Sequence, residues 1–539
     1  MVEIQTTTDY FKFCPGEEQI KISNAICRGR RRSSFPKCPG CQFNDDEKIA
    51  PPVTIMQERA KTVSLVEGLF RQTDISGVVP LPLSEEAAWR IGYACAQYLH
   101  GKLRGHERAD PVARSIIVGR DARVHSEALQ KSLIDGILAA GMDVMQIGLI
   151  DTPAIFFAAN HLKSCGGIVT TGGIDPADCN GFVVCGPKGA PVGAEMGLSA
   201  IRDLAMRIPR HAPASSARQS EYDLSPHYHE FLLAHLQGGR SLPRRLKIVI
   251  DANNGLASRD LPLVLQHIDK LRTKLILAHC GGPAIHDPDP LAPDALGDLK
   301  RAVRETKADF GVALSPDAMI TAFVDERAQS IPPDLVAGLI GRAAIERRPG
   351  STIVVDHRFS SLVIEDLQRA GGNVIRERAT VSHIRKRMTE AHGVFGADLT
   401  GRYYFQQNAY CESAYLAIIQ MINLLAASTE RRLSYLVRPY QRSRTSGEVR
   451  FRCVDVEKVM RELTLAHADA RFEELDGLTI RYDDWWLNVR GDTHSPTLNV
   501  TVEAKSRKLI EQRLAELEPF VGERIFPEFR SAPTAEKRK

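Results

Sequence analysis

The chain has 539 residues, a length typical of several folded domains. Its formal net charge of +4 at pH 7 is small for that length and gives no general case for a nucleic-acid or membrane partner. Its apolar runs are too short to span a bilayer, no secretory leader is visible, and eleven cysteines are too few for a disulfide scaffold, so we expect a cytoplasmic protein with reduced thiols.

The first 60 residues form a cysteine-rich extension. Cys38 and Cys41 make a C-x-x-C knuckle, and with Cys14 and Cys27 they could supply four thiolates to a tetrahedral Zn²⁺. Cys14 and Cys27 do not form a second knuckle, so the spacing fits a loose, reduced tail equally well. The neighbouring basic run at 28–32 either contacts an acidic partner or nucleic acid, or is simply solvated.

Strand and helix signals alternate from residue 65 onward. Ser84, followed by two acids, predicts the start of a helix that runs to Leu99. The continuous apolar run 116–118 predicts a strand, 126–141 a helix ended by glycine, and 143–147 the next strand. This order predicts a parallel sheet covered by helices on both faces.

Two polar segments divide the rest of the chain. The Pro-, Ser- and Ala-rich composition of residues 209–226 predicts a linker. The polar, arginine-rich composition of residues 427–447 predicts a connection to a last domain. Further β-α units open at 247 and 352, and the three successive units are candidates for related structures. The last segment alternates strands and helices and predicts an α+β domain with a largely antiparallel sheet. Its expected strands are 447–453, 478–482, 485–490 and 497–503, its expected helices are 455–464 and 506–517, and 526–539 form a charged tail that we expect to be disordered.

Short motifs recur in a fixed order between residues 68 and about 520. They are GLFRQTDISG (68–77), IIVGRDAR (116–123), IGLIDTP (147–153), GGIVTTGGIDPADCNGF (166–182), KIVIDANNG (247–255), GVALSPDAMITAFVDE (311–326), FGADLTGRYYF (395–405) and VRGDTHSPTLNVTVEA (489–504). In sequence and in order, they resemble the motifs of the α-D-phosphohexomutases, the phosphoglucomutase and phosphomannomutase family.

The resemblance implies an α/β, four-domain architecture behind the cysteine-rich extension of residues 1–60. Three α/β domains with mixed, mainly parallel sheets are expected at 65–208, 220–326 and 327–435. A C-terminal α+β domain is expected at 440–525.

The family carries a phosphoserine in the motif T-A-S-H-N-P, and this chain has none there. Residues 170–176 are TTGGIDP, and the loop is one residue longer than the motif. Thr171 is the nearest hydroxyl and the candidate catalytic residue. We favour the alternative that Thr170 and Thr171 end a strand and bond to local backbone, because an activated nucleophile needs an adjacent base or metal.

The family holds Mg²⁺ with the phosphoserine and the three aspartates of D-G-D-G-D-R. Only Asp317 matches, because Ser315 and Met319 replace the outer two. A single carboxylate rarely binds Mg²⁺ without substrate phosphates, so we expect no Mg²⁺ and interpret Asp317 as a vestigial, solvated acid.

Substrate-binding candidates follow from the remaining motifs. Asp398 and Thr400 stand where the family has a Glu and a Ser that contact sugar hydroxyls, and Arg402 replaces a histidine. Arg402 suits a phosphate or a salt bridge within its own loop. The other candidates are Arg71, Arg123, Arg490, Thr493 and His494; Arg123 could instead pair with Asp121, and Asp492 would repel phosphate.

Strand and turn motifs are kept while the nucleophile and two metal ligands are lost. We therefore favour a catalytically degenerate family member, a pseudoenzyme of carbohydrate metabolism that binds a hexose phosphate or regulates a protein partner. One alternative is an active hexose-phosphate mutase, an intramolecular phosphotransferase with a rebuilt site. The other is an interaction protein that works through its cysteine-rich head.

Overall fold

The computed structural model describes residues 11–14, 21–23, 26–27, 30, 65–105, 107, 110–208, 216–430, 432–453, 455–492 and 496–525. The chain divides into two compact units, Met1–Leu65 and Val66–Lys539. In the first unit, strands β1 (Phe11–Phe13) and β2 (Lys21–Ser23) pair antiparallel. Cys27 is buried and Cys14 half-buried, whereas Cys38 and Cys41 lie outside the described residues, so the four-cysteine site stays a prediction.

The second unit begins with a six-stranded mixed sheet in the order β3-β7-β6-β4-β5-β8. Strands β6, β4, β5 and β8 run parallel, and β7 is antiparallel to both β6 and β3. Its strands are β3 (Ile75–Val78), β4 (Ser115–Arg120), β5 (Asp143–Leu149), β6 (Gly166–Thr170), β7 (Cys179–Cys185) and β8 (Gln219–Glu221).

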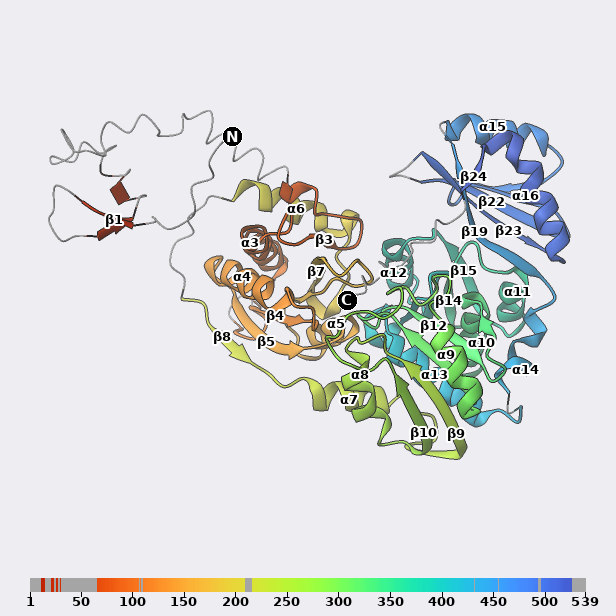
Figure 1. The fold of residues 1–539 in the computed structure, drawn as a ribbon, viewed down its shortest axis with the longest axis horizontal. Helices are drawn as coiled ribbons and strands as arrows, with labels where there is room; N and C mark the ends of the chain where they lie inside the picture. Colours follow the sequence, from red (N-terminus) through yellow and green to blue (C-terminus); the bar gives the residue numbers. More distant parts are fainter. Residues whose placement is uncertain are drawn as a thin grey trace, which may run out of the picture. The chain divides into compact units, whose positions relative to one another are not determined.

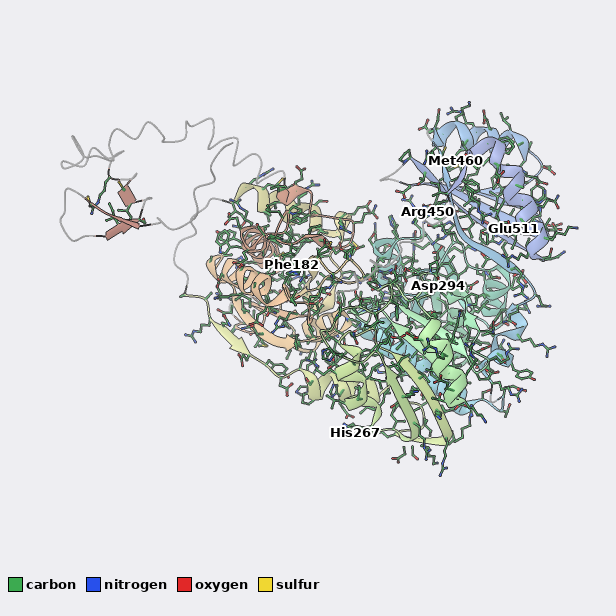
Figure 2. The ribbon with its side chains drawn as sticks, in the orientation of Figure 1. Phe182, His267, Asp294, Arg450, Met460 and Glu511 are labelled. Carbon is green, nitrogen blue, oxygen red and sulfur yellow. The ribbon has the colours of Figure 1, made fainter. Side chains whose placement is uncertain are left out.

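Helices cover both faces of this sheet, as expected. Figure 1 shows α3 (Glu85–Lys102), α4 (Ser126–Ala139), α5 (Thr152–His161) and α6 (Leu198–Arg207) around the sheet. Ile116 and Val118 of β4 pack on one side with α3, α4 and α6, while Ile117 packs on the other with α5. The Ser84 side chain accepts a hydrogen bond from the N–H of Ala87 at 3.1 Å, which confirms the predicted helix start. Phe182 of β7, labelled in Figure 2, is fully buried in this core.

The next two sheets share one topology. Their orders are β10-β9-β11-β12-β13 and β15-β14-β16-β17-β18, and in each the first two neighbouring pairs are parallel and the last two antiparallel. In the first sheet the strands β5-β4-β6-β7-β3 pair in the same way, so all three β-α units are structurally related. The strands are β9 (Ser241–Asp251), β10 (Asp269–Ile276), β11 (Phe310–Leu314), β12 (Thr321–Asp325), β13 (Ser330–Ile331), β14 (Thr352–Asp356), β15 (Asn373–Glu377), β16 (Phe395–Ala397), β17 (Tyr403–Phe405) and β18 (Cys411–Glu412).

The last sheet is antiparallel throughout its described strands, with the order β20-β21-β22-β23-β19-β24. Helices α15 (Val456–Ala466) and α16 (Arg507–Val521) pack on it (Figure 1). They bury the core residues Leu463 and Leu514. The predicted α+β domain is confirmed. The strands are β19 (Arg444–Arg452), β20 (Arg471–Glu473), β21 (Leu478–Arg481), β22 (Trp485–Gly491), β23 (Thr497–Ala504) and β24 (Arg524–Ile525).

Both predicted connecting segments contain regular structure, and the prediction was wrong in those parts. Within 209–226, β8 adds an edge strand because the Arg218 carbonyl accepts from the N–H of Val144 at 2.8 Å, and α7 (Ser225–Leu233) begins before the segment ends. Within 427–447, α14 (Leu433–Val437) forms because the apolar Leu433 and Val437 are buried.

The remaining helices complete the two middle domains. They are α8 (Ala257–Leu265), α9 (Gly297–Thr306), α10 (Pro333–Arg347), α11 (Ser361–Arg369), α12 (Val381–Glu390) and α13 (Ala414–Ala427). Among the described residues, none of the helices is long and apolar enough to cross a membrane.

Candidate functional site

The loop 315–320, between β11 and β12, is a point where three domains meet. The N–H of Thr152, at the start of α5, donates to the Asp317 carbonyl at 3.2 Å, and the N–H of Ala414, at the start of α13, donates to the Ala318 carbonyl at 3.0 Å. A Cβ at Gly255 would lie 2.5 Å from Pro316 Cα, so only glycine allows the turn after β9 to approach this closely. We call residues 172–175, 315–320 and 398–402 the central site.

The loop 315–320 satisfies its own polar groups. The buried Ser315 hydroxyl donates to Asp317 Oδ1 at 2.6 Å and accepts from the N–H of Ile320 at 3.0 Å. Asp317 is half-buried. It is therefore not the fully solvated acid that we expected, because its neighbour binds it.

The side chains of this loop are not a suitable set of ligands for a hard divalent cation. Mg²⁺ needs near-octahedral oxygen ligands, and the loop offers one carboxylate already bonded to a serine, with the apolar Met319 at the third position. Within the described ranges, no group of three or more His, Cys, Asp or Glu side chains has an arrangement that could hold a metal ion. We derive no metal-dependent step at this site.

Thr171 follows the end of β6 and is bonded to nearby backbone. Its N–H donates to the Gly181 carbonyl at 3.0 Å, and its Oγ1 accepts from the N–H of Gly173 at 3.2 Å. The side chain is buried. These contacts are those of the strand-end role that the sequence favoured over a nucleophile.

Two glycines occupy the place of the family serine, depending on the direction of counting. Counted forward from Thr170 the serine position is Gly172, and counted back from Asn180 it is Gly173. A Cβ at Gly172 would lie 2.3 Å from Arg123 Cζ, whereas a Cβ at Gly173 would lie 3.3 Å from Asp317 Oδ2. The space beside Gly172 is therefore filled by Arg123, and Gly173 faces the remaining acid of the metal loop.

Arg123 holds the 173–179 loop together. Its Nη1 donates to the carbonyls of Pro176 and Cys179 at 2.7 and 2.8 Å, and its Nη2 donates to those of Gly173 and Asp175 at 2.9 and 2.8 Å. These four bonds use all four N–H groups of the two terminal nitrogens. The geometry therefore gives Arg123 a structural role, through loop carbonyls more than through the expected Asp121 pair, whose carboxylate lies 3.8 Å from Nε.

The 398–402 turn is also closed on itself. Asp398 Oδ1 accepts from the N–H and hydroxyl of Thr400 at 2.8 and 2.5 Å, and Oδ2 accepts from the Tyr404 hydroxyl at 2.7 Å. Burial raises the pKa of Asp398, and Arg402 and these hydrogen bonds offset only part of that rise. Both predicted sugar-contacting side chains are thus engaged inside the loop.

Arg402 connects this turn to β18. Its Nη1 donates to Thr400 Oγ1 at 2.8 Å, and its Nε lies 3.6 Å from Glu412 Oε1. Burial alone would lower the pKa of the guanidinium, but nearby acidic groups, among them Asp398 and Asp317, raise it above its ordinary value. The side chain is 22% exposed, so part of the guanidinium remains accessible.

Three acids near Arg402 were missed by the sequence reasoning. Burial raises the pKa of Asp74 and of Asp289, and Arg402 lowers part of each rise. Asp74 Oδ1 is buried and has no hydrogen-bond partner in the described part of the chain. Asp74 stands in the motif 68–77 and could have been selected there, whereas Asp289 and Glu412 lie outside the recognised motifs.

Among the predicted arginines, all of which the structure describes, Arg71 is the most accessible. Its side chain is 51% exposed, and its Nη1 lies 3.5 Å from Asp175 Oδ1. Because the ion pair is long and open to water, it contributes little stability and leaves most of the guanidinium donors available.

In the last domain, Arg490 Nη2 donates to Glu448 at 2.7 Å, and Nη1 lies 3.7 Å from Asp476. Two carboxylates therefore compete with any phosphate for this arginine. Thr493 and His494, the other predicted phosphate contacts, lie outside the described residues.

Comparisons with known proteins agree on one family. Models described as phosphoglucomutase/phosphomannomutase, alpha/beta/alpha domains I, II and III match residues 67–209, 226–328 and 332–443. The chain is 29% identical over 452 residues to a protein of Xanthomonas campestris named phosphohexose mutases, covering 83% of this chain and 98% of that protein.

Two solved structures share the fold. A phosphoglucomutase/phosphomannomutase family protein from Burkholderia thailandensis superposes with a TM-score of 0.74 at 23% identity, covering 85% of this chain and 99% of that one. The Aspergillus fumigatus N-acetylphosphoglucosamine mutase, in complex with GlcNAc-6P and magnesium, superposes with a TM-score of 0.52 at 12% identity, covering 87% and 99%.

Proposed function

The chain belongs to the phosphoglucomutase/phosphomannomutase family of carbohydrate metabolism, and from that premise we propose that it binds a phosphorylated hexose at the central site without turning it over through a phosphoserine. Gly173 carries this proposal. The position that faces Asp317 has no side chain to accept a phosphoryl group. The site therefore lacks the side-chain oxygen that would carry the phosphoryl group.

The loss extends to the groups that would assist transfer. Phosphoryl transfer depends on positioning and on neutralising the charge of the transferring group. The 315–320 loop has one carboxylate, and its neighbouring hydroxyl is already bonded. Catalytic groups that act as a unit lose most of their effect when one of them is missing. Without the serine and two of the three aspartates, we expect the phosphoserine mechanism not to operate.

A phosphorylated hexose could still bind without turnover, because two arginines keep N–H groups that can reach a phosphate. Arg71 comes from the first domain and Arg402 from the third, and both guanidinium groups are accessible in part. Guanidinium forks match phosphate oxygens. The fungal relative is described with GlcNAc-6P, and we carry only the sugar phosphate over to this chain. The acids around Arg402 would repel phosphate, so we expect weak binding.

The test pairs turnover with binding. Glucose 1-phosphate and mannose 1-phosphate, with Mg²⁺ and a hexose bisphosphate activator, should give a rate equal to the no-enzyme control. Calorimetry with the same sugars should show millimolar binding that weakens with salt. Arg402→Gln should weaken it about tenfold, whereas Arg301→Gln on α9, an exposed arginine paired with Asp298, should leave it unchanged.

Two results would reject the proposal. Mutase activity that disappears in Thr171→Ala would favour the rebuilt-site mutase instead. Absence of heat with either sugar phosphate at millimolar concentration would remove the sugar-binding half and leave a family fold without that ligand.

A further inference from the structure

A cavity of about 360 Å³ lies away from the central site. It is formed where residues 234–240, the tether between α7 and β9, contact the third domain. The tether is fixed there by Asn423 of α13. Its Nδ2 donates to the His235 carbonyl at 2.9 Å, and its Oδ1 accepts from the N–H of Gln237 at 3.0 Å. The cavity is thus bounded by firmly connected elements of two domains.

The polar part of the described lining has no acidic residue. It contains Arg347, Arg348, His235 and four glutamines, and no aspartate or glutamate. Neither arginine forms an ion pair within the described residues. Arg342, one turn earlier on α10, instead pairs with both Glu346 and Asp366. The cavity therefore carries a positive charge that this chain does not neutralise.

Arg347 reaches inward although part of it is exposed. Its Nη1 donates to Oε1 of the buried Gln420 at 3.2 Å. Burial lowers the pKa of Arg347, and no neighbouring carboxylate raises it again. Because Arg347 is exposed in part and has no carboxylate partner within the described residues, a guanidinium at the mouth of the cavity is open to an anion from solution.

The rest of the cavity is apolar. Half-buried Val394 and the buried Ile340, Phe395 and Phe405 form the apolar part of the wall. A volume of this size lies within the range of small-molecule sites, which combine an apolar wall with a few polar groups that fix orientation. The lining therefore favours a ligand with one acidic group and a compact apolar body.

We propose that this cavity binds a small organic anion, with its acidic group against Arg347 and Gln420 and its apolar body against Phe395 and Phe405. The cavity shares no lining residue with the central site, so anion binding there is independent of sugar-phosphate binding.

The cavity is connected to the central site by one hairpin. Phe395 and Phe405 are paired opposite each other in β16 and β17, and the turn of that hairpin carries Asp398 and Arg402. A ligand in the cavity would contact the base of the hairpin whose tip belongs to the central site. If the anion affects the central site, it does so through this β16–β17 hairpin.

Benzoate and phenyl phosphate are suitable probes because each combines an anion with a compact ring. Calorimetry and ligand-observed NMR on the full chain should detect at least one of them at millimolar concentration, and the pair distinguishes a carboxylate site from a phosphate site. Benzamide, which has the same ring but no charge, should not bind.

Variants locate the binding. Arg347→Gln should weaken binding of the anion at least tenfold, and Gln420→Leu should weaken it independently. Arg369→Gln is the matched control because this exposed arginine of α11 pairs with Glu365 on the surface. Equal binding by wild type and Arg347→Gln, equal binding of benzamide, or no binding of either anion would overturn the proposal.

Discussion

At Gly172 the guanidinium of Arg123 occupies the space that a side chain would need, and at Gly173 the backbone has a φ of +52°. These are two different obstacles to restoring a serine. A side chain at Gly172 must displace an arginine bonded to four carbonyls, whereas a side chain at Gly173 must adopt a left-handed conformation.

We predict that Gly172→Ser lowers the free energy of unfolding by roughly 2–3 kcal/mol, because the new side chain overpacks the loop and breaks charged hydrogen bonds. Gly173→Ser should cost about 1–2 kcal/mol, the usual penalty of a left-handed residue. Urea unfolding of both variants beside the wild type checks this order. Equal stability of Gly172→Ser and wild type would show that Arg123 does not hold the loop.

Asp334 provides a pH prediction at the same scale. Burial raises the pKa of this α10 side chain to about 6, although the N–H groups of Ser360 and Leu335 donate to it and lower part of the rise. Above pH 4 the unfolded chain releases this proton while the folded chain keeps it until about pH 6. Its contribution to stability is therefore complete below pH 4 and is lost as the pH rises through about 6.

We predict that Asp334→Asn removes this loss, which amounts to about 3 kcal/mol for a shift of that size. The difference in unfolding free energy between the variant and the wild type, measured from pH 4 to pH 7, isolates the effect, because other titrating groups cancel. A difference that does not change with pH would contradict the buried, protonated state of Asp334.

Between elements, Glu503 joins the third and fourth domains. From β23 its carboxylate accepts hydrogen bonds from the hydroxyl of Ser360 at 2.6 Å and from the N–H of Ser361 at 3.1 Å, at the start of α11. It also accepts from the Ser443 hydroxyl and the Trp486 indole N–H. A buried anion at a helix N-terminus with four donors is well stabilised.

We predict that Glu503→Gln destabilises the junction by roughly 2 kcal/mol or more, because the amide nitrogen cannot accept from those donors. Limited proteolysis should then cleave the connection near 438–443 faster than in the wild type. Glu511→Gln on α16, labelled in Figure 2, is the control, since Glu511 pairs with Arg524 near the surface at 3.4 Å. The same cleavage rate in both variants would rule out Glu503 as the connection.

The helices and strands were predictable where a local signal was strong. Ser84 has a capping hydroxyl before two acids, and Gly141 ends α4 with a φ of +86°. Strand β8 was missed because an edge strand of three exposed residues is held by backbone bonds to β5, which leave no hydrophobic pattern. Helix α14 was missed because it has only five residues and lies between the charged Arg432 and Arg438.

The candidate site was predictable only as far as motifs reach. Matching positions located Asp317, Asp398 and Arg402, but not what their side chains bind. Arg123 donates to loop carbonyls some 50 residues away in the sequence. Asp398 accepts hydrogen bonds from Thr400 and Tyr404 because of the geometry of its loop. Motifs report neither kind of contact. Asp289 was invisible because its relation to Arg402 arises only when two domains meet.

Across the whole molecule, one topology is repeated in the second and third sheets, and the first sheet shares its mixed pairing. The loop 315–320 keeps three domains in contact and has Ser315 and Met319 where the family motif has its outer two aspartates. Under the proposed function, such a junction serves binding, which needs several domains to converge.

The most direct measurement is intact-protein mass spectrometry after incubation with a hexose 1,6-bisphosphate and Mg²⁺. A mutase of this family is charged by such a donor before it can act. We predict that the mass of this chain stays unchanged, because neither Gly172 nor Gly173 offers an acceptor and Thr171 is buried and bonded to backbone. A mass increase of one phosphoryl group, mapped to residues 170–181 and absent in Thr171→Ala, would contradict the account.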